Sequence, residues 1–369
     1  MYRLILVGGG HAHLSVLHTL ATSRSNIEVV LITPGTHQAY SGMLPGWMAG
    51  HYRLSDCQID LRPLALAAGV KLVINHVTGM DANRRRVALS DGSHLNYDLL
   101  SLDVGSETDL SWLEALGKRL LPIKPMGVFV QRWSEMMTKV AKQNNFRLVV
   151  VGGGAAGVEI ALAAQYAFNE CSYNATVTLI ASERGVLPGH APGVANRVRD
   201  LLKQRGITLH QAHAVGVEDG VLLGNGQHLN ADIVIAATGS IPPYWLKTSQ
   251  LGLDEYGYIS VDATHRSLSH HDVFAVGDVC ARTDTVMARS GVHAVFAGSV
   301  VAHNLIASMT DGKFVRYLPR RRSLYLLATG PKHAIASWGA FSAAGHWVWR
   351  WKNWIDRRFM NKHKAEVSP

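Results

Sequence analysis

The chain contains the same local pattern twice, and this duplication limits the folds it can adopt. An apolar run begins at Arg3 in the first copy and at Phe146 in the second, and triple glycines follow at positions 8–10 and 152–154. After each glycine run come a helix-forming stretch and a second β-branched run, which predicts a strand, a tight turn, a helix and a strand. Because parallel strands need such crossover helices, the duplication predicts two doubly wound α/β sheets.

Length and composition agree with a chain of several domains. The 369 residues exceed one ordinary domain, and 47% apolar against 17% charged residues indicates large buried cores and excludes a mostly disordered protein. No apolar run of 18 residues is present, and the first apolar run leads directly into a glycine turn instead of a signal-cleavage site. We therefore expect a cytoplasmic protein.

Neither cysteines nor histidines suggest a metal or a disulfide framework. Cys57, Cys171 and Cys280 are isolated, with no C-x-x-C pair, and we interpret them as small buried hydrophobic residues. His11 and His13 are spaced like metal ligands but have no third ligand in sight, so no metal site is expected.

The second glycine run has the complete spacing of a dinucleotide-binding loop. Gly152, Gly154 and Gly157 satisfy G-x-G-x-x-G between a predicted strand and helix, where backbone N–H groups can bind a pyrophosphate. The alternative is a glycine turn that only packs a helix on a strand. In the first copy Gly8 and Gly10 are in place, but His13 occupies the third glycine position.

Three further segments support ligand binding in both copies. The apolar runs at residues 97–102 and 231–236 are predicted strands, and they close on small-residue turns at Gly105 and Gly239. A third predicted strand, from residue 273, ends at Gly277-Asp278. There a carboxylate can accept hydrogen bonds from a polyol while glycine permits close approach.

Over residues 1–318 this order of motifs resembles the pyridine nucleotide-disulfide oxidoreductase superfamily. The resemblance implies that FAD and a nicotinamide nucleotide bind in two Rossmann-like domains. The implied FAD site consists of Gly8, Gly10, His11, Ala12, Thr33, Val77, Gly105, Asp278, His293 and Ala294. The implied NAD(P)H site consists of Gly152, Gly154, Ala156, Gly157, Glu183 and Gly239.

Two residues are candidates for a direct part in the reaction. The resemblance places Glu159 near the nicotinamide, which it would position. It also places His293 in the first turn of a helix that points at the flavin, where the helix dipole stabilises the anionic reduced ring. The alternative for His293 is a surface histidine in a helix cap.

Departures from the superfamily pattern narrow the activity. Residues 40–48 lack the cysteine pair of the disulfide reductases, and the cysteines that sulfide:quinone reductases need beside the flavin are also missing. The chain is instead similar to type II NADH dehydrogenases. The segments GGGHAH, YSGMLPG and WRWKNWIDRRFM resemble the dehydrogenase-like module that is fused to selenide, water dikinase in some proteins.

Ribose recognition departs from the pattern as well. Thr33-Pro34 stands where an acid usually binds the FAD ribose, and Ala181-Ser182 precedes Glu183 after the second copy's strand. Glu183 favours NADH, whereas the adjacent Arg184 would suit NADPH, and both nucleotides stay open.

The C-terminal residues 345–364 combine aromatic and basic side chains. On a helix, Trp347, Trp351, Trp354, Ile355 and Phe359 share one face, as in helices that lie at a membrane surface. The net charge of +9 is concentrated toward this end, which favours an anionic surface. The alternative is a face that packs on its own domain or in a homodimer. Nucleic acid is not expected, because no reader motif is present.

The sequence thus predicts an FAD-binding domain split over residues 1–108 and 257–318. It also predicts an inserted NAD(P)H-binding domain over 109–256 and a small C-terminal element over 319–369. We expect hydride transfer from NADH to flavin and electron transfer to a quinone, with the protein peripheral on the inner face of the membrane. Two alternatives are a soluble flavin reductase or oxidase with a protein, oxygen, selenium or sulfur acceptor, and a flavin-binding module without hydride transfer.

Overall fold

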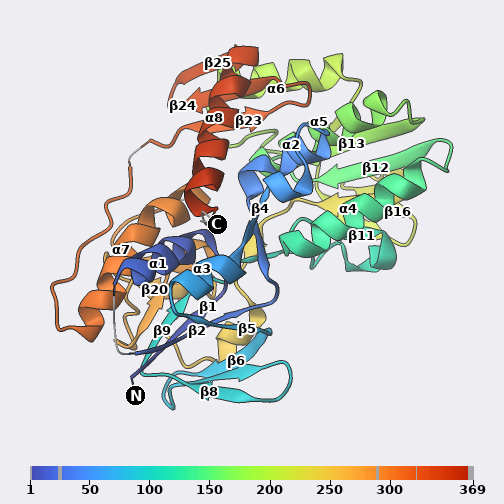
Figure 1. Ribbon diagram of the computed structural model, residues 1–369. Coiled ribbons are helices and arrows are strands. Elements are labelled where there is room, and N and C mark those ends of the chain that lie inside the picture. Colours follow the sequence, from blue (N-terminus) through green and yellow to red (C-terminus); the bar gives the residue numbers. More distant parts are fainter. Residues whose placement is uncertain (1, 24–26, 288–290, 321, 365–369) are drawn as a thin grey trace.

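A computed structural model describes residues 2–23, 27–287, 291–320 and 322–364. Two five-stranded parallel sheets dominate it, each covered by helices, and they lie side by side in Figure 1. The predicted α/β fold class is confirmed.

The first sheet has the strand order β21-β9-β1-β2-β5. Its strands are β1 (Arg3–Val7), β2 (Glu28–Thr33), β5 (Lys71–Ile74), β9 (Leu99–Leu102) and β21 (Val273–Ala275). Helices α1 (His11–Thr22), α3 (Leu61–Ala67) and α7 (Gly291–Met309) belong to this unit. The helices α1 and α7 pack closely at Gly298, where an added Cβ would lie 2.9 Å from the backbone of Ala12.

The second sheet repeats the arrangement with the order β11-β18-β12-β13-β14. Its strands are β11 (Leu120–Pro122), β12 (Phe146–Val151), β13 (Ala175–Ala181), β14 (Thr208–Gln211) and β18 (Ile233–Ala236). Helices α4 (Met126–Val140), α5 (Ala155–Glu170) and α6 (Pro192–Gln204) belong to it. In both sheets the strand before the glycine run lies at the centre, so the two glycine turns occupy equivalent places.

Smaller elements follow the same duplication. Each unit carries a three-stranded antiparallel sheet, formed by β6 (Val77–Asp81), β7 (Arg86–Leu89) and β8 (His94–Asn96) in the first and by β15 (Ala214–Val217), β16 (Gly220–Leu223) and β17 (His228–Asn230) in the second. The chain passes between the units at β10 (Glu107–Thr108) and β19 (Ser240–Ile241), which pair antiparallel. Shorter elements are β3 (His37–Ala39), α2 (Leu44–Met48), β4 (Gln58–Asp60), β20 (Ile259–Val261) and β22 (Cys280–Arg282).

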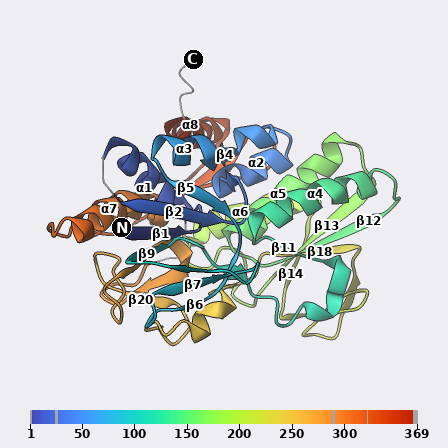
Figure 2. The ribbon, with the colours of Figure 1, turned by 60° about the horizontal axis from the view of Figure 1, so that its bottom comes forward.

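The C-terminal element contains more structure than the sequence predicted. A three-stranded antiparallel sheet of β23 (Tyr325–Ala328), β24 (Ala334–Trp338) and β25 (Phe341–Gly345) precedes α8 (His346–His363). The sequence indicated only a small element with an aromatic and basic helix here. Figure 2 shows α8 on the same side of the molecule as α3 and α2.

Two expectations from single residues need correction or refinement. Cys57 and Cys280 are buried as expected, but Cys171 is exposed because it follows the last residue of α5.

The helix α7 is long and apolar enough to cross a membrane by length and composition, yet 50% of its most apolar 18-residue window is buried in the molecule. We interpret α7 as a core helix, since Val301 and Leu305 lie in the core of the first unit.

Candidate functional site

The turn before α5 forms an open cradle for an anion. An added Cβ at Gly152 would lie 2.1 Å from the carbonyl oxygen of Ala237, and one at Gly157 would lie 1.8 Å from the carbonyl oxygen of Gly152. Both positions therefore require glycine. Gly154 faces open space instead, with no described atom within 4 Å of an added Cβ, and no described side chain caps the first turn of α5. The N–H groups of this helix start can donate hydrogen bonds to a phosphate.

Other predicted NAD(P)H residues lie around the same sheet edge. Ala156 is in the first turn of α5 and is exposed, Gly239 follows β18, and Glu183 is exposed on the turn after β13. The carboxyl ends of parallel strands form the usual binding edge of such a sheet. These placements agree with the predicted site, whose individual residues stay predictions.

The turn before α1 has the same shape but is already paired with an acid. An added Cβ at Gly8 would lie 2.3 Å from the carbonyl oxygen of Asp103, and one at Gly10 would lie 2.3 Å from its carboxyl carbon. The Asp103 Oδ2 accepts hydrogen bonds from the backbone N–H of Ala12 at 2.9 Å and of His13 at 3.0 Å. Asp103 is 5% exposed and was not among the residues that the sequence singled out.

The histidine at the third glycine position has a structural role. His13 is fully buried, and its Nδ1 and Nε2 lie 2.6 Å from the carbonyl oxygen of Gly8 and 2.8 Å from Ser101 Oγ. Burial lowers the pKa of His13 to about 4, so the ring is neutral at pH 7. A neutral histidine therefore bridges the glycine turn and β9.

A second polar group forms where three segments meet. The Lys124 Nζ donates to Asp278 Oδ2 at 2.8 Å and to Ser106 Oγ at 2.8 Å. These residues follow β11, β21 and β9 respectively, so the ends of strands from both sheets meet here. Sequence reasoning identified Asp278 but missed Lys124, because the pair is separated by 154 positions.

A cavity of about 360 Å³ lies beside Asp278. His265, Cys280, Arg282 and His293 are among the residues that line it. Cys280 also lines this cavity, because the turn after β21 brings it there two residues beyond Asp278. That no cysteine lies beside the flavin stays a prediction. No disulfide forms among the three cysteines, all of which are described.

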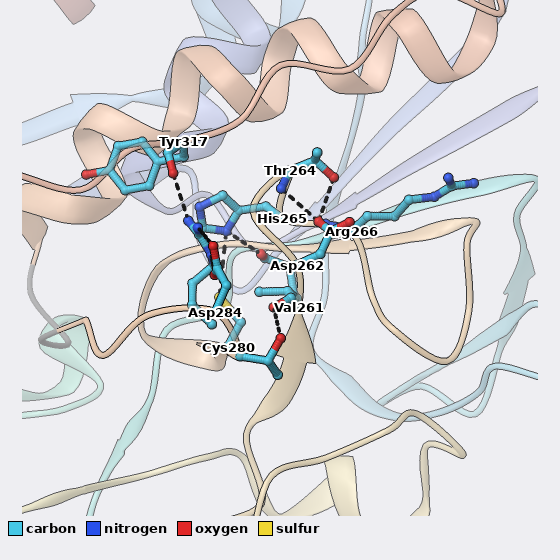
Figure 3. A network of polar contacts seen from close by, with 11 residues as sticks. Val261, Asp262, Thr264, His265, Arg266, Cys280, Asp284 and Tyr317 are labelled. Atoms are coloured by element: carbon cyan, nitrogen blue, oxygen red, sulfur yellow. Dashed lines mark hydrogen bonds and ion pairs between the residues drawn. The ribbon is translucent and has the colours of Figure 1, made fainter.

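A polar network that runs from the interior to the surface lies beside this cavity (Figure 3). The Arg282 guanidinium donates to both carboxylate oxygens of Asp284 at 2.8 Å and to the carbonyl oxygen of Tyr317 at 3.1 Å. The His265 Nδ1 donates to the carbonyl oxygen of Ala275 at 3.0 Å, and burial lowers the pKa of His265 to about 4. The Arg282 contact with Tyr317 ties β22 to the chain that follows α7, and the His265 contact ties the segment before β21 to the end of β21.

His293 lies in the first turn of α7, as predicted, but it is not a surface residue. It is 6% exposed, and its Nδ1 lies 3.0 Å from the Tyr317 hydroxyl. Burial lowers the pKa of His293, and its Nδ1 shares a hydrogen bond with the tyrosine hydroxyl. The surface-cap alternative is therefore wrong. Its neighbour Ala294, also predicted to contact FAD, is buried beside Gly277.

Glu159 links α5 to the C-terminal element. Its Oε1 accepts a hydrogen bond from the backbone N–H of Ala328 at 2.7 Å. Burial raises the pKa of Glu159 to about 7, although the positive charge of Lys352 and the hydrogen bond from Ala328 act in the opposite direction. The carboxyl group is thus close to half-ionised at neutral pH.

Lys352, whose positive charge acts on Glu159, belongs to a buried ion pair. Lys352 Nζ donates to Asp356 Oδ2 at 2.7 Å and to the carbonyl oxygen of Gly42, and the Tyr40 hydroxyl donates to Asp356 Oδ1 at 3.2 Å. The side chains of Lys352 and Asp356 are 9% and 5% exposed. This ion pair fastens α8 to the segment before α2, and only its i, i+4 spacing is visible in the sequence.

Comparison with known proteins identifies the kind of molecule that carries these sites. The family model described as pyridine nucleotide-disulphide oxidoreductase matches residues 2–298. Ferroptosis suppressor protein 1 of Taeniopygia guttata is 26% identical over 344 residues, which cover 89% of this chain and 86% of that protein.

Two solved structures share the fold over almost the whole chain. NDH2 from Plasmodium falciparum, solved in complex with NADH, has a TM-score of 0.84 at 13% identity and covers 98% of this chain and 97% of its own. The sulfide:quinone oxidoreductase of Aquifex aeolicus has a TM-score of 0.80 at 16% identity, with coverages of 100% and 93%. Both structural matches extend over the C-terminal element as well.

Proposed function

Since this chain belongs to the pyridine nucleotide-disulphide oxidoreductases, on the NADH dehydrogenase-like branch, we propose that it transfers electrons from NADH through FAD to a quinone at a membrane surface. FAD and NAD(P)H are the cofactors of this family. Bound flavin takes a hydride from the nicotinamide and passes two electrons to an acceptor. The chain supplies the two binding edges, the orientation of the rings and the access of the acceptor.

The proposed FAD site uses the glycine turn before α1 and the acid after β21. Gly8, Gly10, His11 and Ala12 form the helix start, with Asp103 in direct contact with it. Thr33 ends β2, Val77 begins β6 and Gly105 lies in the turn after β9, where the adenosine and ribityl parts are expected. Asp278 is the acceptor for the ribityl hydroxyls, with Lys124 holding its carboxylate in place.

Asp278→Ala tests this assignment. We expect the FAD dissociation constant to rise about 10- to 100-fold, because a charged acceptor for a hydroxyl contributes roughly 1.5–3 kcal/mol. Flavin retention after dialysis measures the effect, and Asp272→Ala, which removes a carboxylate paired with Arg85 in the same unit, serves as the control. Wild-type retention in Asp278→Ala would remove the residue from the site.

The observation that carries the quinone proposal is the exposed aromatic face of α8. Trp347, Trp351 and Trp354 are 55%, 39% and 57% exposed. The exposed basic side chains on α8 and directly after it are Arg350, Arg357, Arg358, Lys362 and Lys364, of which Arg358 lies over the Trp354 ring. Tryptophan with lysine and arginine is the composition of helices that lie in the headgroup region of a bilayer.

The opposite face of α8 belongs to the protein interior. Val348, Lys352, Asp356 and Met360 are buried, and Phe359 packs against the core of the first unit. The predicted face that included Ile355 and Phe359 is therefore too wide, since only its tryptophans point outward. One helix thus carries an exposed aromatic surface on one side and, on the other, Lys352, whose charge acts on Glu159, which favours an acceptor that arrives from a membrane.

We expect Trp347→Gln, Trp351→Gln and Trp354→Gln together to abolish binding to anionic vesicles. The buried apolar area of three rings is lost, and the remaining basic residues contribute only about 1 kcal/mol each, a term that salt weakens. Co-sedimentation with phosphatidylglycerol vesicles measures binding, while the flavin spectrum and the reduction of a short-chain quinone should persist.

Truncation after Ser342 is not a clean test, because it removes Lys352, Asp356 and Met360 from the interior. Tyr244→Gln provides the control for loss of an exposed aromatic ring, since Tyr244 is 74% exposed on the 3-10 helix Tyr244–Thr248. Vesicle binding by the triple variant equal to that of the control would exclude the membrane surface and favour a soluble acceptor.

A further inference from the structure

The internal duplication provides a reference for an acid that the proposed reaction does not use. In the first sheet Val7 pairs with Leu102, and in the second Val151 pairs with Ala236. The next residues, Asp103 and Ala237, are therefore equivalent. Their carbonyl oxygens confirm this equivalence. A Cβ added at Gly8 would lie 2.3 Å from the carbonyl oxygen of Asp103, and one added at Gly152 would lie 2.1 Å from that of Ala237.

The equivalent positions differ in what occupies the helix start. At α5 the alanine leaves the first turn open to a phosphate. At α1 the Asp103 carboxylate binds the N–H groups of Ala12 and His13, two of the amides that a pyrophosphate at this turn would use. Its carboxyl group also lies against the α-carbon of Gly10 and within 2.9 Å of an added Cβ at Gly277. It therefore lies between the two glycines that line the expected path of FAD.

The charged groups around Asp103 do not neutralise it. His11 from α1 and Asp278 from the turn after β21 both act on it electrostatically, and Asp278 is already paired with Lys124. His13 is neutral because both ring nitrogens are engaged and its pKa is low. Burial raises the pKa of Asp103 to about 6, while the N–H groups of His13 and Ala12 and the charge of His11 oppose that rise.

A pyrophosphate beside an ionised Asp103 would place like charges together in a buried site. Such pairs raise the pKa of the weaker acid until it takes up a proton. A protonated carboxyl group can then donate a hydrogen bond to a phosphate oxygen instead of repelling it.

We propose that Asp103 contacts the FAD pyrophosphate as a neutral carboxylic acid, and that FAD binding therefore takes up one proton from solvent. The proton is bound by a carboxylate oxygen of Asp103, and no covalent bond to the nucleotide forms. Asp103 thereby becomes a residue that sets FAD affinity as a function of pH.

The direction in which pH changes FAD affinity follows from the two pKa values of Asp103, one without FAD and a higher one with FAD bound. Below pH about 6 Asp103 is already protonated without FAD, so the dissociation constant is flat. Above that value each pH unit should raise the dissociation constant about tenfold, until the pH reaches the higher pKa that Asp103 has beside FAD. FAD is thus expected to dissociate more readily at alkaline pH.

The test compares the flavin-loaded wild type with Asp103→Asn. Each protein is diluted at pH values from 5.5 to 8.5, and the fluorescence of released FAD gives the dissociation constant. We expect the wild type to weaken by about tenfold per pH unit above its midpoint and Asp103→Asn to stay nearly constant, binding more tightly than wild type at pH 8. The amide keeps the size of the side chain and removes its charge.

Two further measurements make the outcome decisive. An indicator dye in weak buffer at pH 7.5 should report close to one proton taken up per FAD rebound by the wild type and none by Asp103→Asn. Asp103→Ala, which restores the residue of the equivalent position, keeps the test available if the asparagine variant does not fold. Equal pH slopes in wild type and variant, or no proton uptake, would overturn the proposal.

A reciprocal variant examines the other copy. Ala237→Asp places an acid at the start of α5 and should weaken NADH binding while leaving the FAD dissociation constant unchanged. Loss of FAD without any change in NADH binding would contradict the equivalence of the two turns. The proposal depends on FAD alone, so failure to reduce quinone leaves it standing.

Discussion

Gly154→Val is expected to raise the NADH concentration needed for half-maximal flavin reduction by about 100-fold or more, with FAD still bound. No described protein atom lies within 4 Å of a Cβ added at Gly154, so the valine does not strain the fold. It would instead occupy the space in which backbone and pyrophosphate must touch, and glycine is used in such turns for that approach. Anaerobic stopped-flow measurement of flavin bleaching against NADH concentration gives the result.

Gly127→Val is the matched control for this variant. Gly127 also faces open space and lies in the first turn of α4, in the same unit, but away from the glycine turn in the sequence. Its NADH dependence should equal that of the wild type. If Gly154→Val also leaves the NADH dependence unchanged, the second unit does not bind NADH at α5, and the module without hydride transfer becomes the better description.

Glu159→Ala is expected to slow flavin reduction by about tenfold, with a smaller effect on NADH binding. Orientation of the reacting ring contributes to the rate more than to affinity, and Glu159 is proposed to provide it. The change also leaves the N–H of Ala328 without its acceptor, which costs about 1–3 kcal/mol of stability. Stopped-flow rates at saturating NADH and thermal unfolding measure the two effects separately.

Glu159→Gln separates charge from hydrogen bonding, because the amide oxygen can still accept from Ala328. In the wild type the carboxyl group is neutral below its pKa of about 7 and ionised above it, so the reduction rate should change across neutral pH. The glutamine variant should show at every pH the rate that the wild type approaches at low pH. The same inflection in both proteins would assign Glu159 a structural role only.

The duplicated fold was predictable because its signal is local. The runs at Arg3 and Phe146 and their glycine turns coincide with β1, β12 and the starts of α1 and α5. Gly152 and Gly157 have a purely steric reason to be glycine, and a steric requirement of this kind is visible in a single sequence. The predicted domain boundary after residue 108 falls at the end of β10.

The polar contacts of the site were not predictable in the same way. Lys124 meets Asp278, and Glu159 meets the backbone of Ala328, only because the two sheets and the C-terminal element fold against each other. Asp103 was the exception, since aligning residues 102–105 with 236–239 would have shown an acid where the other copy has alanine. The sheet of β23–β25 escaped prediction because runs such as Ala334-Ile335-Ala336 lack the alternation of a half-buried strand.

Because β10 and β19 pair antiparallel, the two chain connections between the inserted unit and the first unit lie side by side. Segments whose two ends lie together can be lengthened, shortened or exchanged without reshaping the host domain. Here, however, β23 also rests on α5 and Gly330 lies against Tyr166. The C-terminal element therefore packs against both units. Exchange of the inserted unit requires a replacement whose equivalent of α5 still packs against β23.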